Sequence, residues 1–263
     1  MATASSPILQ RVYYNHYKAS DFASGFGNDW SADAIPISVF SAGAHQFVQG
    51  RYSGTGTING FLDVTDAGFD EVEHGNITTT DGEQWILRCY RSTTQAHRMA
   101  FETREHDAGD SRIADTAGVA MINWNGQSQE AAVHGQILSV GEQVISATGG
   151  TTGINVGTTA TTDTMVVTVR VIAVDTFTSA TVTIEESSDD GSADAYAKIT
   201  GWTLTEQDPS TVVDIGTPDE VTFTGLGAAK FTVAKVTEAW KRINVTALTG
   251  TSFTVIATIG NAT

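Results

Sequence analysis

Residues 183–191 read Thr-Ile-Glu-Glu-Ser-Ser-Asp-Asp-Gly, and residues 240–245 read Trp-Lys-Arg-Ile-Asn-Val. The first stretch is typical of a β-strand that ends in an acidic turn, because Asp-Gly tolerates the dihedral angles of a turn. The second stretch is expected to open a hairpin that turns at residues 249–251, Thr-Gly-Thr. Together they predict a series of strands joined by tight turns.

The composition also favours an all-β protein. The 263 residues include 26 Gly but only 4 Pro, and 40% of the residues are hydrophobic. β-Branched Thr and Val favour strands, and glycine supplies the turns between them. A protein of this composition can build a packed core, which excludes a disordered acidic protein. We therefore expect an all-β fold with one short helix.

Strand and turn signals fill most of the sequence. In the first half they predict strands over residues 84–91, 96–103, 118–124 and 131–140, with a hairpin turn at 125–128. In the second half they predict strands over residues 165–174, 180–186, 198–204, 221–223, 230–235, 242–248 and 253–259. The short helix is expected over residues 63–75, where Thr65 or Asp66 can cap it and Gly75 can end it.

A Gly and Thr cluster at residues 146–153 is expected to separate two domains. Residues 1–150 would form a first β domain that contains a long loop. Residues 151–263 would form a second β-sandwich, because about six strands in about 110 residues is the density of a sandwich.

The net charge is −16, from 30 Asp and Glu against 14 Lys and Arg. Proteins that grip DNA cluster Lys and Arg against the phosphates, so this balance argues against a DNA-gripping surface. It permits passive contact, because a negative wall repels a duplex and keeps it from sticking. A soluble acidic protein is the simpler explanation of the charge alone.

Cysteine use and the N-terminal sequence bear on the compartment. Cys89 is the sole cysteine, so no internal disulfide is possible and folding needs no oxidising compartment. It lies in the apolar run 85–90 and is expected to fill core space. Residues 1–7 lack the features of a signal peptide, and no apolar stretch approaches the ~18 residues of a spanning helix. We expect a soluble protein, made in the cytoplasm, with no membrane partner.

No residue pattern predicts a catalytic centre, a cofactor site or a metal site. The six histidines form no H-E-x-x-H pair, and G-x-S-x-G, phosphate-binding and dinucleotide motifs are absent from the sequence. Residues 187–194 carry oxygens that suit calcium but lack the D-x-D-x-D-G spacing, so a turn is the simpler expectation. The five scattered tryptophans fit core packing better than a sugar-binding platform. We expect a non-enzymatic protein with no cofactor.

The order of several weak motifs resembles that of major tail tube proteins of tailed, siphovirus-like bacteriophages. These motifs are the Val-rich strand 166–174, the acidic turn 184–191, the aromatic strand 199–203, the Lys-Arg stretch 241–245 and the closing Ser-Phe-Thr-Val-Ile-Ala of 252–257. Residues 49–63 are similar to the stretch that precedes a short helix in those proteins. Ile243 departs from the family, which usually has Tyr at that position.

This resemblance implies a tail-tube-type β-sandwich or barrel and a structural role in the virion tail. Such subunits form hexameric rings that stack into a hollow tube for DNA ejection. The partners would be further copies of the same protein, other tail proteins and, passively, the DNA in the lumen. A long apolar loop around residues 25–50 would contact a neighbouring ring or subunit through Trp30, Ile35, Ile37, Val39, Phe40 and Phe47. Lumen candidates are Asp63, Asp66, Asp70, Glu71 and Glu73.

Three alternatives stay open at the level of the sequence. The first is another virion component, such as a head decoration or tail-terminator protein. The second is a carbohydrate-binding adhesive β-sandwich, and the third is an enzyme. Six-fold rings or tubes in electron micrographs distinguish the tail tube subunit from a monomer that binds glycans.

Overall fold

The computed structural model describes residues 10–21, 23–36, 47–61, 83–90, 99–114, 120–128, 133–139, 141–157, 164–208, 212–213, 219–233 and 238–262. Contacts divide the protein into two compact units. Unit 1 comprises Met1–Lys18, Leu87–Glu102 and Ala132–Thr263, and unit 2 comprises Ala19–Ile86 and Thr103–Ala131. Within the described ranges no helix is long and apolar enough to cross a bilayer.

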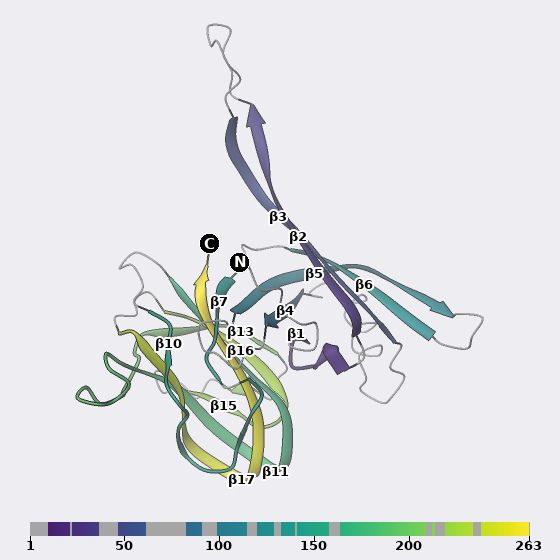
Figure 1. Ribbon diagram of the computed structural model, residues 1–263. Helices are drawn as coiled ribbons and strands as arrows, with labels where there is room; N and C mark the ends of the chain where they lie inside the picture. The colour runs from purple at the N-terminus through teal and green to yellow at the C-terminus, as the bar shows by residue number, and fades with distance from the viewer. Residues whose placement is uncertain are drawn as a thin grey trace, which may run out of the picture. The chain divides into compact units, whose positions relative to one another are not determined.

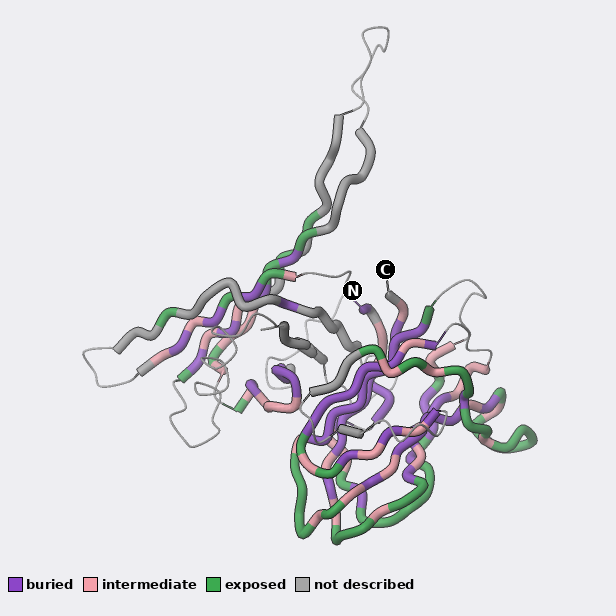
Figure 2. Tube along the Cα trace, turned by 180° about the vertical axis from the view of Figure 1, so that it is seen from behind, coloured by how far each residue is buried: buried purple, intermediate pink, exposed green. Residues whose placement is uncertain are grey.

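Unit 1 is organised around two long antiparallel strands, β11 (Met165–Ser187) and β17 (Trp240–Ala262). They pair along their whole length, from Met165 opposite Asn261 to Ser187 opposite Trp240. The resulting ribbon bends in its middle, where residues 173–179 and 246–252 are largely exposed (Figures 1 and 2). Three register shifts lie at or beside this bend, as expected because a bulge adds a residue to one strand and increases its twist.

Shorter strands widen each half of the ribbon into a sheet. Residues 165–171 of β11 pair with β16 (Gly227–Val233), which pairs with β13 (Trp202–Asp208). On the other side of this half, β17 pairs with β7 (Val133–Ile137) and β8 (Gln143–Ile145). In the other half, β11 pairs with β15 (Val221–Phe223) and β12 (Ala197–Lys198), and β15 pairs with β14 (Val212–Val213). There β17 pairs with β9 (Gly149–Gly150) and β10 (Ile154–Asn155).

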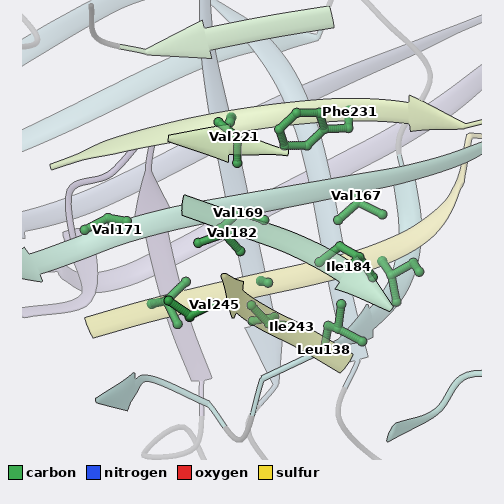
Figure 3. Packing of buried hydrophobic residues seen from close by; sticks show 14 of the residues in the cluster. Leu138, Val167, Val169, Val171, Val182, Ile184, Val221, Phe231, Ile243 and Val245 are labelled. Atoms are coloured by element: carbon green, nitrogen blue, oxygen red, sulfur yellow. The ribbon is translucent and has the colours of Figure 1, made fainter. Parts of the chain in front are cut away.

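The two halves of the ribbon enclose one hydrophobic core. Val167, Val169 and Val171 from the first half of β11 belong to the same buried cluster as Val182 and Ile184 from its second half (Figure 3). Isoleucine, valine and phenylalanine side chains from β15, β16 and β17 also belong to this cluster. Unit 1 is therefore a β-sandwich whose two sheets share a single bent pair of strands.

The alternation of buried side chains changes phase along β11. Its inward residues are odd-numbered up to Val171 and even-numbered from Ala180 onward, whereas β17 keeps odd-numbered residues inside from Ile243 to Ile259. The register shifts between Val171 and Val182 change the pairing of β11 with β17 by a net one residue. Successive side chains of a strand point to opposite faces, so a one-residue shift moves the other set of side chains inward. Both halves of the continuous strand β11 can therefore direct apolar side chains into the same core.

A second, smaller cluster covers the opposite face of the first half of the ribbon. Tyr13 of β1 (Gln10–Tyr14) packs with Ile137 of β7 and Ile256 of β17. The fully buried Arg170 donates a hydrogen bond from Nε to the Asn15 carbonyl oxygen at 2.8 Å. The N-terminal segment of unit 1 is therefore anchored by both apolar packing and a buried hydrogen bond.

Unit 2 contains the hairpin of β2 (Ala23–Pro36) and β3 (Phe47–Phe61), preceded by the 3₁₀ turn η2 (Ala19–Asp21). β3 also pairs with β6 (Ala120–Ser128), which pairs in turn with residues 105–114 of β5 (Met99–Ala114). The first residues of β5, Met99–Glu102, pair with β7 and belong to unit 1. β4 (Glu83–Tyr90), which carries Cys89, is likewise divided between the units at Leu87.

The all-β expectation is confirmed, but three expected turns or breaks are wrong. Residues 125–128 continue β6, residues 249–251 continue β17, and residues 175–179 continue β11. Glycine has a different use at two of these places. The Trp124 side chain occupies the space beside Gly126, and Gly250, with φ of +134°, lets the Thr176 carbonyl approach closely. The expected helix over 63–75 lies outside the described residues.

The two compact units do not coincide with an expected division at residue 150. β7 and β8 precede residue 150 yet pair with β17, and Leu138 and Ile145 belong to the main core. Both strands pair with residues 253–262 of β17, so they belong to the sheet of that half of the ribbon. Independent folding of residues 1–150 and 151–263 stays a prediction.

Candidate assembly surfaces

The hairpin of unit 2 continues past the strands that flank its base. β6 pairs with β3 over Thr55–Phe61, whereas β2 pairs with β3 from Gly60 to Phe47. Among the described strands, only β2 and β3 therefore pair with each other over residues 30–36 and 47–54. We call these two segments the outer arm (Figure 1). At about 3.3 Å per residue, the outer arm spans about 20 Å.

The base of the hairpin is held by a buried face rich in glycine. Ile58 lies opposite Trp124 in the register of β3 and β6, and both side chains are fully buried. A Cβ atom on Gly126 would lie 2.2 Å from the Trp124 ring and 2.5 Å from Glu105 Oε2. The indole and the buried carboxylate therefore fill the space that any larger side chain at position 126 would need.

The outer arm is exposed at Ser31 and Ser53, whereas Gly54 at its base is buried. Ser31 and Ser53 face each other across the hairpin, with their Oγ atoms 3.1 Å apart, and both residues are exposed. The expected loop over residues 25–50 is wrong for the described residues 25–36 and 47–50, which are strands. Hydrogen bonding between β2 and β3 extends further into this segment than its Gly and Pro content indicates.

Three of the six candidate contact residues have a place in this hairpin. Trp30 pairs with Gly54, Ile35 with Val48, and Phe47 with Pro36. The other three, Ile37, Val39 and Phe40, lie outside the described residues. So do all five lumen candidates: Asp63, Asp66, Asp70, Glu71 and Glu73. The roles given to these eleven residues stay predictions.

A second surface feature lies at the end of the ribbon in unit 1. The register of β11 and β17 places Glu185 opposite Arg242 and Glu186 opposite Lys241. Arg242 donates from Nε to Glu185 Oε2 at 2.7 Å, and its Nη2 lies 2.6 Å from the same oxygen. Asn244 Nδ2 donates to Glu185 Oε1 at 2.7 Å. Opposite charges directly across a ladder favour this register over a shifted one.

The Arg242 guanidinium also contacts two segments outside these strands. Its Cζ lies 3.9 Å from the centre of the Tyr196 ring, which is a cation–π contact. A Cβ atom on Gly150 would lie 2.4 Å from Arg242 Nε, so only glycine leaves room for the guanidinium there. Burial and the hydrogen bond from its hydroxyl to Asp190 raise the pKa of Tyr196. Arg242 therefore links β11, β9 and the acidic turn.

Lys241 is the buried member of the second pair. Its Nζ lies 3.1 Å from Glu186 Oε2 and donates a hydrogen bond to the Glu238 carbonyl oxygen. The Lys241 side chain is completely buried, and this burial lowers its pKa although Glu186 acts in the opposite direction. A buried cation requires such partners, because an uncompensated charge in the interior is strongly destabilising.

The acidic turn after β11 uses its own carboxylates as hydrogen-bond acceptors. Asp189 accepts backbone N–H groups from Ser192, Ala193 and Asp194 at 3.0, 2.7 and 3.1 Å. These hydrogen bonds lower the pKa of the Asp189 carboxyl group. In the described parts of the protein, no group of three His, Cys, Asp or Glu side chains is arranged to hold a metal ion. The arrangement stabilises a turn rather than offering oxygens to a cation.

The ion pairs have a signal in the sequence, in the charges of two short stretches. Glu-Glu at residues 185–186 and Lys-Arg at residues 241–242 are complementary when their strands run antiparallel. Tyr196 and Gly150 had no comparable signal. Their contacts with Arg242 depend on the path of two separate segments, β9 and the chain after the acidic turn, which no local pattern specifies.

Comparisons with known proteins complete these observations. No protein-family model matches the sequence, and no curated protein matches it. Among solved structures, the protein is similar to the SPP1 tail tube, with a TM-score of 0.43 and 8% identity over 52% of this chain and 82% of that one. It is also similar to a protein in the virion of a native gene transfer agent, with a TM-score of 0.38 and 8% identity over 50% of this chain and 98% of that one.

A further similarity extends over nearly the whole length of the protein. It is to the SPP1 Dit protein of the hub adsorption apparatus, with a TM-score of 0.34 and 9% identity over 96% of this chain and 98% of that one. All of these TM-scores are below 0.5, so the likeness supports no statement about what this protein binds or does. The similar solved structures include tail tube, virion tail and baseplate proteins, and tail tube proteins are the class that the sequence resembles.

Proposed function

We propose that the protein is a structural subunit of a phage tail, and that six copies form rings that stack into the tail tube. In this role the protein has no catalytic step. Its chemistry is the pairing and packing of copies of itself and of other tail proteins. The order of the sequence motifs supports this proposal, and the observation that carries it is the outer arm.

The outer arm is expected to be only marginally stable in an isolated monomer. A two-stranded hairpin is marginally stable in water, and its outer edges present rows of unpaired backbone N–H and C=O groups. Within the described residues, the outer arm has no third strand, and Ser31 and Ser53 are exposed. A neighbouring copy can satisfy those groups and cover the arm. A head-to-tail contact of this kind forms a closed ring when the rotation that relates neighbouring copies is a whole fraction of a full turn.

Strand β13 of unit 1 has features that disfavour pairing with another subunit. β13 pairs with β16 on one side, and the register shifts between Leu204 and Glu206, which is a bulge. Thr205, in this bulge, donates a hydrogen bond from Oγ1 to the Lys230 carbonyl oxygen at 3.0 Å. Bulges and acidic residues blunt an edge against pairing. We infer that β13 is protected from association, in contrast to the outer arm.

The charge of the protein suits a conduit for DNA. A net charge of −16 repels a duplex and keeps it from adhering to a channel wall. Passive contact with DNA during ejection, and a lumen lined in part by Asp63, Asp66, Asp70, Glu71 and Glu73, belong to this proposal. A tube whose lumen is strongly positive would contradict that part of it.

The register of the hairpin allows a clean test. Trp30 and Gly54 are direct partners, so residues 31–53 can be replaced by Asn-Gly, a two-residue turn that closes antiparallel strands. The shortened protein keeps Ile58, Trp124 and the rest of the hairpin base. We expect it to fold, so that its far-ultraviolet circular dichroism signal, divided by the number of strand residues, equals that of the unchanged protein. We also expect it to stay monomeric in gel filtration and negative-stain micrographs.

A matched control keeps the arm and changes unit 1. Thr178→Ala lies on the exposed bend of the ribbon and is expected to form the same rings or tubes as the unchanged protein. Tubes from the shortened protein would refute the role of the outer arm. A single ring that does not stack would favour a hub or terminator position in the virion, and a glycan-binding monomer from the unchanged protein would favour an adhesive β-sandwich.

A further inference from the structure

The turn after β11 contains a chemically sensitive dipeptide in an exposed position. Asp190 and Gly191 are both exposed, and their φ angles are +62° and +76°. An Asp-Gly bond is prone to isomerisation because glycine has no side chain to hinder attack by its own amide nitrogen. Asp81–Gly82, the second Asp-Gly of the sequence, lies outside the described residues.

Isomerisation needs two atoms of this dipeptide to meet. The Gly191 amide nitrogen loses its proton and attacks Asp190 Cγ. A C–N bond forms, a C–O bond of the carboxyl group breaks, and water leaves, which gives a five-membered cyclic imide. Water then adds to either imide carbonyl and breaks one of its C–N bonds, so the product is either aspartate or isoaspartate. Water is released and consumed again, and no other reactant takes part.

Each of these groups is engaged in a hydrogen bond to another side chain. The Gly191 N–H donates to Ser187 Oγ at 2.8 Å, so the attacking nitrogen is directed toward the buried serine. The Tyr196 hydroxyl donates to Asp190 Oδ1 at 2.6 Å, so the carboxylate is directed toward the tyrosine. Reaction requires the nitrogen and the carbon in near-attack geometry, and each hydrogen bond must break before they reach it.

The two holding side chains are themselves fixed. Ser187 Oγ donates to the Asp194 carbonyl oxygen at 2.7 Å and also accepts the Asp189 N–H at 3.2 Å. That set uses the one donor and both acceptor positions of a hydroxyl. The Tyr196 ring is held by its contact with Arg242. We propose that Ser187 and Tyr196 suppress isomerisation at Asp190–Gly191, which is a modification site that stays closed while this turn is intact.

The test compares rates of isoaspartate formation at one peptide. The full-length protein, Tyr196→Phe and Ser187→Ala are incubated at neutral pH and moderate temperature, digested, and analysed by mass spectrometry that resolves the Asp190 peptide from the Asp81 peptide. Ser192→Ala is the matched control, because Ser192 is an exposed serine of the same turn that takes part through its backbone N–H. The unchanged protein in concentrated urea gives the rate without the turn.

Loss of one net hydrogen bond corresponds to about a fivefold change in the population of the open turn. Tyr196→Phe and Ser187→Ala are each expected to form isoaspartate at position 190 about fivefold faster than the folded unchanged protein. Ser192→Ala is expected to match the folded protein, and the urea sample to be fastest. Equal rates for the folded and urea samples would overturn the proposal, as would an unchanged rate in Tyr196→Phe. Equal acceleration in all three variants would also overturn it, because general loosening would then be the cause.

Discussion

Replacing Arg242 by alanine tests how strongly β11 and β17 hold each other at the Ser187–Trp240 end of the ribbon. The change removes the contacts of Arg242 with Glu185 Oε2 at 2.7 and 2.6 Å and its stacking on Tyr196 at 3.9 Å. Hydrogen bonds between charged groups contribute about 1.5–3 kcal/mol, and a cation–π contact at a wet site about 0.5–1 kcal/mol. Because the Arg242 side chain is 27% exposed, solvent screens part of the ion pair. We expect Arg242→Ala to lower the local stability of unit 1 by about 2–3 kcal/mol.

Two comparison variants make this prediction specific. Arg242→Lys keeps the charge but loses the planar fork and the stacking, so it should lose about half as much stability. Lys198→Ala removes a more exposed ion pair, whose Nζ lies 3.4 Å from Glu220 Oε1 with 34% of the Lys198 side chain exposed. Such surface pairs contribute about 0–1 kcal/mol, so Lys198→Ala should change little.

The measurement is hydrogen exchange of peptides that cover residues 183–196 and 240–248. A global unfolding curve is less suitable, because a protein of two compact units need not unfold in one step. Exchange reports the free energy of local opening directly. If Arg242→Ala changes that free energy by less than about 0.5 kcal/mol, or if Lys198→Ala changes it as much, the reasoning about this pair is refuted.

The remaining predictions concern backbone geometry and pH. Thr176→Gly should stabilise unit 1 by up to about 1 kcal/mol in urea titration, because a β-branched residue is strained at φ of +44°, whereas Thr178→Gly should destabilise it. Gly135→Ala should destabilise unit 1 by about 2–3 kcal/mol, since its Cβ would lie 2.0 Å from the Ile259 carbonyl oxygen; an unchanged melting temperature would contradict this. The folded pKa of Asp189 lies below its ordinary value of 3.8, so its stabilisation is complete above that pH and is lost as the pH falls through the folded pKa. Amide protection at residues 192–194, measured by NMR, should therefore persist at pH 5 and fall at lower pH, while Asp189→Asn should lack that dependence.

The strands that follow strict local patterns were predictable from the sequence. The strand expected at residues 84–91 is β4, Glu83–Tyr90, and that expected at 221–223 is β15, Val221–Phe223. The strand expected at residues 165–174 lies within β11, where Val167, Val169 and Val171 belong to the main core. Short apolar runs bounded by turn signals sufficed to indicate these strands.

The ribbon itself was not predictable, because its length depends on tertiary contacts. Thr-Gly-Thr at residues 249–251 has the composition of a turn, but β17 continues through it and stays paired with β11 on both sides. Bulges near the bend, the left-handed backbone of Thr176 and the open conformation of Gly250 together allow the ribbon to curve without a turn. The phase change between Val171 and Ala180 is a consequence of these bulges and looks in the sequence like two separate strands.

The assembly residues were only partly accessible to sequence reasoning. The apolar content of residues 25–50 marked the segment, but its Gly and Pro residues indicated a loop where β2 and β3 form a hairpin. Paired backbone groups outweigh such local preferences when two extended segments lie in register. The contacts of Arg242 with Tyr196 and Gly150 join segments that are far apart in the sequence, so no pattern within one window could predict them.

Cryo-electron microscopy of the purified full-length protein tests the central claim most directly. We predict six-fold rings that stack into a hollow tube, in which residues 30–36 of β2 and 47–54 of β3 contact a neighbouring subunit along the edge that is unpaired within the described residues. A protein that stays monomeric at high concentration, or an assembly in which the outer arm touches no other copy, would contradict the account.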